Sequence, residues 1–322
     1  MSTTDLFPAS FASTTTPATV AATKSTDVPT TRGGETFAEQ AVVFGSHHHL
    51  VGVYHQPAQS IDAKTAAIFV TPGMLHHVGP FRLHVDLART LGCRGLASFR
   101  FDLSGIGESL PVGSRGQSIE RATDEIRQAI DWLQREHGIE QVILFGLCSG
   151  ADDSLHAAVR DPRVSGVVAM DACGYRTGRF WIHRVGHYAS RLVSARAWKR
   201  MLGRRLPRRS KNSAPAYRSI PMGTDLREFP SRKIALREFQ RLVDRGCRLH
   251  LVYTGGVSEY YNYENQFFDM LHGVRWKNHA TVDFRPEMDH VAMLCEDRKW
   301  LVNRVCEQMI EFVHTGPTQP SR

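Results

Sequence analysis

The chain has 322 residues, 42% hydrophobic and 22% charged, which is ordinary for a globular protein and enough to bury a substantial core. Its longest apolar runs are only as long as a strand, so no membrane-spanning helix is expected. Six cysteines are scattered without paired C-x-x-C spacing. This pattern argues against a zinc site or a disulfide framework, and it favours a reducing, cytoplasmic setting.

The formal charge of +8 is distributed unevenly along the chain. Residues 172–211 contain twelve Lys and Arg and no Asp or Glu, so the rest of the chain is net negative. The basicity therefore belongs to one segment and does not characterise the whole protein. Nucleic-acid binding is not expected, because no recognised binding motif accompanies these charges.

The first 34 residues are biased toward Thr, Ser, Ala and Pro. Such a segment has little to bury, and it lacks the basic start and continuous apolar stretch of a secretory signal. We therefore expect residues 1–34 to form a disordered tail.

From about residue 40, short apolar segments alternate with longer amphipathic ones. This alternation predicts an α/β fold, with a mostly parallel eight-stranded sheet and helices on both faces. The expected strands lie within "EQAVVF" (39–44), "LVGVYH" (50–55), "TAAIFVTPG" (65–73), "GLASFRFDLSGIGES" (95–109), "EQVILFG" (140–146), "RVSGVVAMD" (163–171), the second half of 237–256, and "HATVDFRPEMDH" (279–290). The expected helices are near 80–92, 118–138, from Ser149 onward, the first half of 237–256, 264–274 and 297–314.

Two common cofactor motifs are missing from this pattern. There is no G-x-x-x-x-G-K-[ST] phosphate loop, and "SGIGES" lacks the third glycine of a dinucleotide-binding loop. No cofactor or metal is therefore expected.

The sharpest motif is "GLCSG" (146–150), between a predicted strand and a predicted helix. A G-x-nucleophile-x-G turn of this kind is a nucleophile elbow, whose tight backbone needs small residues two before and two after the nucleophile. Cys148 satisfies this register with Gly146 and Gly150, whereas Ser149 would be flanked by the bulkier Leu147. A thiol at a helix N-terminus is also expected to have a lowered pKa. The pattern favours Cys148 as the nucleophile.

In enzymes built around such an elbow, the acid follows the nucleophile along the chain and the histidine comes last. His290 lies in the loop after the last predicted strand and is the candidate base. The acid is open between two carboxylates, because no aspartate follows "LVYTGG" (251–256). Glu259 is the nearest carboxylate to that strand, and Asp171 ends the preceding one. Asp289, next to His290, is expected to brace the loop.

An oxyanion hole needs two backbone N–H groups aimed at the developing negative charge. One is expected from Ser149, directly after the nucleophile. The other is expected from the loop "TPGMLHH" (71–77), at Met74 or Leu75.

From about residue 38 to its end the chain resembles an α/β-hydrolase of the serine aminopeptidase S33 type, and in particular the exosortase A system-associated hydrolases. The resemblance rests on "PGMLHHVGPFRLHVDLARTL", "RFDLSGIGES", "FGLCSGA" and "YRTGRFWIHRVGHYASRLVSARAWKRML". It implies a hydrolase core (35–171 and 233–322), a small helical cap and bacterial exopolysaccharide surroundings. Two features depart from the family: a cysteine stands where the usual nucleophile is serine, and the expected aspartate is missing.

The cap is expected over residues 172–232, where the strand–helix alternation breaks. Apolar residues there recur at helical spacing with arginines between them. One interpretation is a cap helix that covers the active-site cleft with its apolar stripe. The other is that the arginines attract an anionic substrate or an acidic membrane surface.

Together these patterns predict a hydrolase that cleaves an ester, lactone or thioester through a Cys-His-acid triad and a covalent acyl-enzyme. Peptide cleavage is less favoured, because an amine is a poorer leaving group for a thiolate. Two alternatives stay open: an acyltransferase using the same acyl-enzyme, and a non-catalytic binding module with this fold.

Overall fold

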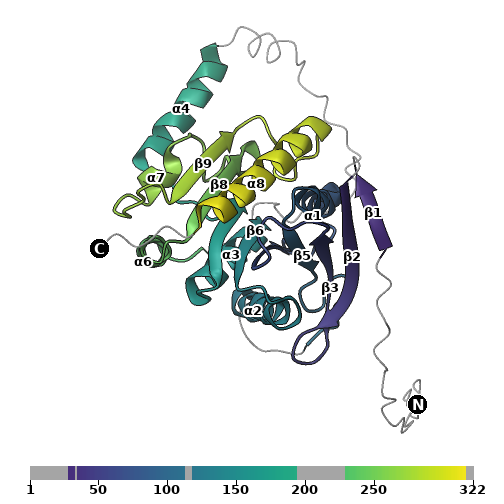
Figure 1. The fold of residues 1–322 in the computed structure, drawn as a ribbon. Helices are drawn as coiled ribbons and strands as arrows, with labels where there is room; N and C mark the ends of the chain where they lie inside the picture. Colours follow the sequence, from purple (N-terminus) through teal and green to yellow (C-terminus); the bar gives the residue numbers. More distant parts are fainter. Residues whose placement is uncertain (1–27, 33–34, 113–117, 194–228, 317–322) are drawn as a thin grey trace, which may run out of the picture.

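The computed structural model describes residues 28–32, 35–112, 118–193 and 229–316, with the backbone alone for 28–32, 35–36 and 186–193. Within these residues nine strands form one sheet with helices packed around it (Figure 1). The elements are β1 (Val28–Arg32), β2 (Glu35–Phe44), β3 (Leu50–Pro57), β4 (Thr65–Val70), η1 (Pro80–Arg82), α1 (Leu83–Cys93), β5 (Ala97–Phe101), α2 (Ser118–His137), β6 (Gln141–Leu147), α3 (Ser149–Arg160), β7 (Val164–Met170), α4 (Gly178–Val193), α6 (Arg232–Asp244), β8 (Arg248–Thr254), η2 (Gly255–Val257), α7 (Gln266–Met270), β9 (Ala280–Arg285) and α8 (Cys295–Thr315).

The strand order across the sheet is β1-β2-β3-β5-β4-β6-β7-β8-β9. The pairs β1–β2, β2–β3 and β3–β5 are antiparallel, and every other neighbouring pair is parallel. Strands β2 to β9 are the eight mostly parallel strands that the sequence predicts, so this expectation is confirmed. Because β6, β7, β8 and β9 are parallel neighbours, the loops that follow them meet at one edge of the sheet.

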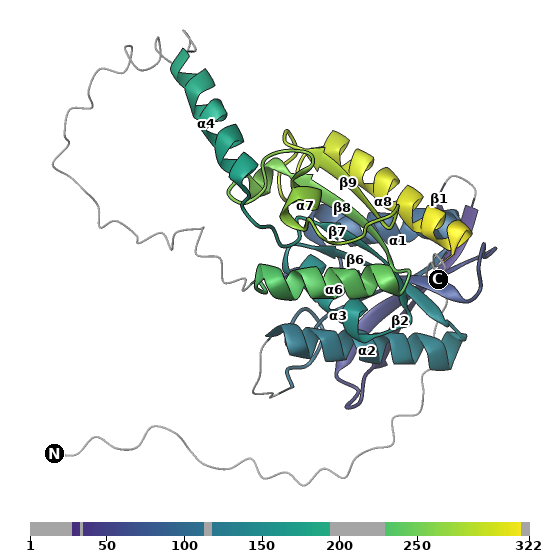
Figure 2. The ribbon, with the colours of Figure 1, turned by 90° about the vertical axis from the view of Figure 1, so that its left-hand side faces the viewer.

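The centre of the sheet is buried on both faces. All six residues of β4 are buried, and so are residues 142–147 of β6, as their continuous apolar sequences predict. Helices α1 and α8 cover one face, and α2, α3 and α6 cover the other (Figures 1 and 2). In α2 the helical spacing of Ile126, Ile130 and Leu133 directs all three side chains into the core.

Strand β1 corrects one boundary predicted from the sequence. Residues 28–32 were expected in the disordered tail, but they pair antiparallel with β2 from Val28 opposite Glu39 to Arg32 opposite Glu35. The β-branched Thr30 and Thr31 favour an extended backbone, and Pro29 is tolerated because β1 is an edge strand. The rest of the predicted tail, residues 1–27 and 33–34, lies outside the described residues.

The predicted cap is described only at its two ends. Helix α4 points away from the sheet (Figure 2). Its Phe180 is fully buried, whereas Trp181 and Val185, two further apolar residues of the stripe predicted to cover the cleft, are more than half exposed. Residues 194–228, which hold most of the predicted basic cap, lie outside the described residues.

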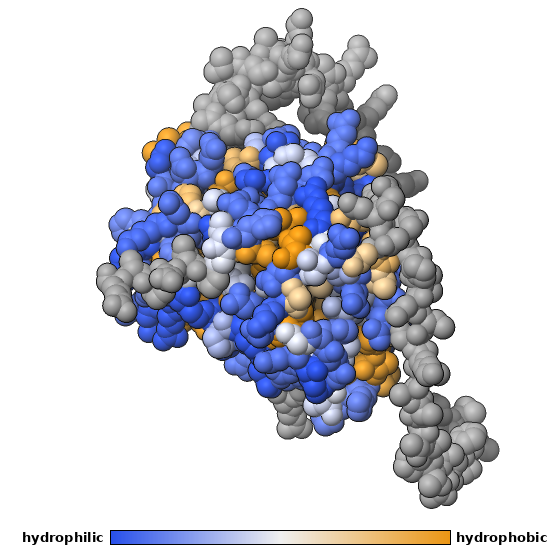
Figure 3. All heavy atoms as spheres, viewed as in Figure 1, coloured by the Kyte–Doolittle hydropathy of each residue, from blue (hydrophilic) through white to orange (hydrophobic). Residues whose placement is uncertain are grey.

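No helix in the described part of the chain combines the length and apolar character that crossing a membrane requires. The face in Figure 3 is largely hydrophilic, with small apolar patches between the polar residues.

Candidate active site

Cys148 occupies the corner between β6 and α3, where the sequence places the nucleophile. Its backbone has φ 57° and ψ −122°, a conformation that is costly for any residue other than glycine. A Cβ on Gly146 would lie 2.0 Å from the carbonyl oxygen of Gly150, and one on Gly150 would lie 2.7 Å from that of Val70. The tight corner therefore requires both glycines, and Cys148 is the residue between them.

His290 follows β9 and lies beside a buried carboxylate. Its Nδ1 is 2.7 Å from Oδ2 of Asp171, and about a third of its side chain is exposed. Burial alone lowers the pKa of this imidazole. Hydrogen bonds with the Asp171 carboxylate and the Cys148 side chain outweigh burial and raise the pKa to about 10. The histidine therefore joins the cysteine and the aspartate in one hydrogen-bonded chain.

Asp171 comes directly after β7, and the surrounding backbone fixes its orientation. The residue is fully buried and has φ 51°. Its carboxylate accepts hydrogen bonds from the backbone N–H and the hydroxyl of Thr254, both at 2.7 Å, in addition to the contact with His290. Thr254 is the last residue of β8, the strand next to β7 in the sheet. The end of β8 therefore fixes the Asp171 carboxylate.

Glu259, the other candidate acid, lies elsewhere. Its side chain is exposed, and its backbone carbonyl accepts a hydrogen bond from Nε of Arg176. Among the described residues, Asp171 is the carboxylate that contacts the His290 ring. Asp289 accepts the backbone N–H groups of Val291 and Met293, the loop contacts expected of it from the sequence.

The expected oxyanion-hole groups come from two segments in contact. Ser149 begins α3, and its hydroxyl accepts a hydrogen bond from the backbone N–H of Gly73 at 2.7 Å. Met74 follows in the same loop, with 90% of its side chain exposed. Neither the Ser149 nor the Met74 amide donates a backbone hydrogen bond to another described residue.

Asp102 holds this loop in place, although it was not among the residues expected at the site. It follows β5, is fully buried, and accepts hydrogen bonds from the backbone N–H and Nδ1 of His77 and from the N–H of Glu108. The sequence signal was "RFDLSGIG": an acid at a strand end followed by a Gly-rich turn. A Cβ at Gly107 would collide with the Asp102 carboxylate at 2.2 Å.

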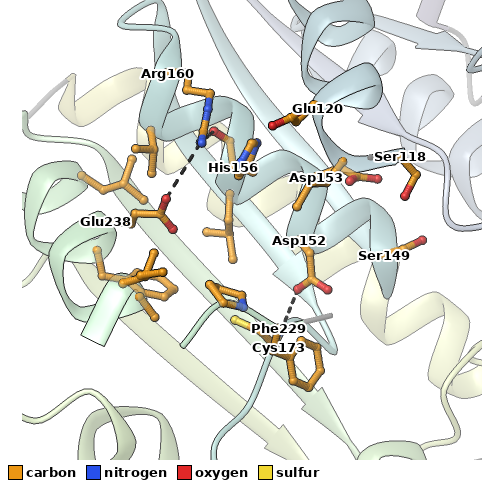
Figure 4. Close-up of a pocket in the computed structure, with 18 residues that line it drawn as sticks. Ser118, Glu120, Ser149, Asp152, Asp153, His156, Arg160, Cys173, Phe229 and Glu238 are labelled. Carbon is orange, nitrogen blue, oxygen red and sulfur yellow. Dashed lines mark hydrogen bonds and ion pairs between the residues drawn. The ribbon is translucent and has the colours of Figure 1, made fainter. Parts of the chain in front are cut away.

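A cavity of about 650 Å³ begins at Ser149 and follows α3 away from the corner (Figure 4). Its lining includes neither Cys148 nor His290, so it adjoins the hydrogen-bonded chain without enclosing it. In the described part of the chain, no three His, Cys, Asp or Glu side chains gather as metal ligands would.

The family model described as "Serine aminopeptidase, S33" matches residues 62–228, about half of the chain. The chain belongs to this family. A comparison with curated proteins gave no match.

Solved structures similar to this family member share its fold. Proline iminopeptidase from Mycobacterium smegmatis aligns with a TM-score of 0.51 and 12% identity, over 85% of this chain and 98% of that one. A putative hydrolase from Agrobacterium vitis S4 aligns with a TM-score of 0.50 and 16% identity, over 89% and 98%. A putative α/β hydrolase from Agrobacterium tumefaciens aligns with a TM-score of 0.50 and 14% identity, over 86% and 98%. At these identities the likeness establishes the α/β-hydrolase fold.

Membership in the S33 family confirms the resemblance and the prediction that the protein is a hydrolase. The match spans the loop at Met74, the corner at Cys148 and Asp171, and it ends before His290. The family is named for serine enzymes, yet this member has cysteine at the corner, with a serine next to it. The association with exosortase systems stays a prediction.

Proposed function

We propose that the protein hydrolyses a carboxylic ester, lactone or thioester through a Cys148–His290–Asp171 triad and a covalent acyl-enzyme. The observation that carries this proposal is that His290 makes hydrogen bonds on two sides, with Asp171 and with Cys148. An imidazole held in this way by a carboxylate activates a neighbouring nucleophile. Membership in a hydrolase family supports the reaction class.

In the first half-reaction the Sγ of Cys148 attacks the substrate carbonyl carbon. A carbon–sulfur bond forms, and the bond to the leaving alcohol or thiol breaks. Because Nδ1 of His290 faces Asp171, its Nε2 is the atom that gives a proton to the leaving group. The raised pKa of His290 keeps that proton on the ring at neutral pH.

In the second half-reaction Nε2 of His290 takes a proton from water, and the hydroxide attacks the acyl-enzyme. A carbon–oxygen bond forms, the carbon–sulfur bond breaks, and the thiolate–imidazolium pair is restored together with the free acid. The Ser149 and Met74 amides stabilise the negative oxygen in both steps.

The first test uses acetyl p-nitrophenyl ester and an acetyl thioester with three proteins: wild type, Cys148→Ala and Ser149→Ala. We expect Cys148→Ala to lose at least about a thousandfold in kcat/KM, because the attacking atom is gone. Ser149→Ala keeps its backbone amide and should retain most of the turnover. Mass spectrometry of quenched wild type should find the acetyl group on Cys148. Turnover lost only in Ser149→Ala would show that Ser149, and not Cys148, is the nucleophile. An inactive wild type would favour a binding module.

The second test separates the two candidate acids. Asp171→Asn removes the acceptor for Nδ1 of His290, and we expect kcat/KM to fall at least about a hundredfold. Glu259→Gln changes an exposed carboxylate of similar size and is the matched control, with activity expected at the wild-type level. The reverse result would reassign the acid to Glu259.

Adding an alcohol acceptor and measuring its acylation would distinguish acyl transfer from hydrolysis. The cytoplasmic setting, the anionic substrate and the membrane contact stay predictions of the sequence.

A further inference from the structure

An elongated groove leads away from the proposed catalytic cysteine. It is the cavity of about 650 Å³ along α3, and its side walls come from the start of α2 and from α6 (Figure 4). It begins at Ser149, directly after the cysteine, and extends to Arg160 at the end of the helix. The volume is in the range of sites that hold small organic ligands, which makes the groove a candidate for part of the substrate.

The groove is lined by both apolar and acidic side chains. Apolar side chains of α3 and α6 line it, among them Leu155, Val159, Ile234, Phe239 and Leu242. Four carboxylates also line it, at Glu120, Asp152, Asp153 and Glu238.

The positive charge that the described residues contribute to the groove is already engaged in an ion pair. Among the described residues that line the groove, Arg160 is the only Lys or Arg, and its guanidinium lies 3.9 Å from the Glu238 carboxylate across the groove. Burial, with a smaller contribution from Arg160, lowers the pKa of His156 to about 4, so that ring is neutral at pH 7. A carboxylate on a ligand would therefore meet repulsion here.

The position of His290 decides which part of a substrate this groove can hold. The leaving group must contact His290, because it receives a proton from that ring. No residue of the loop that carries His290 lines the groove. The groove therefore faces the other side of the reacting carbonyl, where the acyl chain extends.

We infer that the groove along α3 binds the acyl chain of the substrate, and that this chain is extended, apolar and without a terminal carboxylate. The inference rests on the proposed acyl-enzyme at Cys148. It makes Val159 on α3 and Ile234 on α6, which both line the groove, residues that determine chain-length specificity.

The test compares p-nitrophenyl esters that share a leaving group and differ in the acyl group: acetyl, butyryl, octanoyl, and octanoyl with a terminal carboxylate. Val159→Trp narrows the groove from a half-buried position on α3. Val43→Trp, at a valine of β2 that is 57% exposed and outside the groove, is the matched control. Ile234→Trp narrows the groove from α6 and serves if Val159→Trp fails to fold.

In wild type we expect kcat/KM to rise from acetyl to octanoyl, and the terminal carboxylate to abolish that gain. Val159→Trp should lower octanoyl turnover at least about tenfold while acetyl turnover changes less than about twofold, because an occluded apolar pocket discriminates by chain size. Val43→Trp should match wild type on every ester. Equal activity on acetyl and octanoyl in wild type, or the same chain-length profile in Val159→Trp, would overturn the inference while leaving the proposed function intact. A wild type inactive on all four esters would instead refute the proposed function.

Discussion

The ionisation of Cys148 and His290 is the residue-level property that can be measured most directly. The His290 pKa of about 10 lies above the ordinary histidine value, so the imidazolium persists through neutral pH and is lost only as the pH approaches 10. A positive ring beside the thiol favours the thiolate. We therefore expect iodoacetamide to alkylate wild-type Cys148 at a rate that is nearly constant from pH 7 to about 9.

In His290→Ala that rate should instead rise with pH through the ordinary cysteine pKa of about 8.5. At pH 7 it should be at least about tenfold slower than in wild type, because only a few per cent of an ordinary thiol is ionised there. Stopped alkylation followed by peptide mass spectrometry gives both profiles. Identical profiles in the two proteins would show that His290 does not set the ionisation of Cys148.

The same residues show how far sequence reasoning reaches. The register at Cys148 follows from five consecutive residues, because Gly146 and Gly150 are required by contacts within the corner itself. The acid could be narrowed only to Asp171 or Glu259. Both follow neighbouring parallel strands, β7 and β8, and therefore lie near the same edge of the sheet. Which one meets His290 depends on contacts of Asp171 with Thr254, 83 residues away, that no local pattern records.

At the scale of elements, the turn after β8 supports the loop that carries His290. A Cβ at Gly256 would lie 2.6 Å from Cβ of His290 and 2.8 Å from its backbone nitrogen. Such distances force the loop to move, because backbone cannot rotate aside like a flexible side chain. We expect Gly256→Ala to lower kcat/KM at least about tenfold through displacement of the base, with the thermal midpoint changed little.

Gly178→Ala is the matched control for this substitution. Gly178 begins α4, and a Cβ there meets nothing within 4 Å, so activity and thermal midpoint should both stay at wild-type values. Wild-type activity in Gly256→Ala would mean that the loop carrying His290 can move to make room for the Cβ without any loss of catalysis. "TGG" (254–256) predicts a turn, but its contact with residue 290 comes only from the parallel pairing of β8 with β9.

In the molecule as a whole, the strand–helix alternation of the sequence predicts every strand of the sheet except the edge strand β1. The inner strands carry continuous apolar runs, which predict burial on both faces. Strand β1 has the sequence "VPTTR" and no apolar periodicity, so composition placed it in the tail. What orders it is backbone pairing along the exposed edge of β2, a contribution that side-chain patterns do not report.

This pairing predicts a difference between two truncations. A protein of residues 28–322 keeps β1, whereas one of residues 35–322 loses five paired positions and leaves β2 as the edge strand. An uncovered edge presents unpaired N–H and C=O groups that recruit other chains. We expect the thermal midpoint of the shorter protein to fall by about 2–4 °C for each kcal/mol of unfolding free energy that it loses. We also expect the shorter protein to self-associate more. Thermal unfolding and light scattering at matched concentration measure both effects. Because 28–322 already lacks residues 1–27, any difference between the two proteins belongs to residues 28–34, and equal midpoints would mean that β1 contributes nothing to the stability of the sheet.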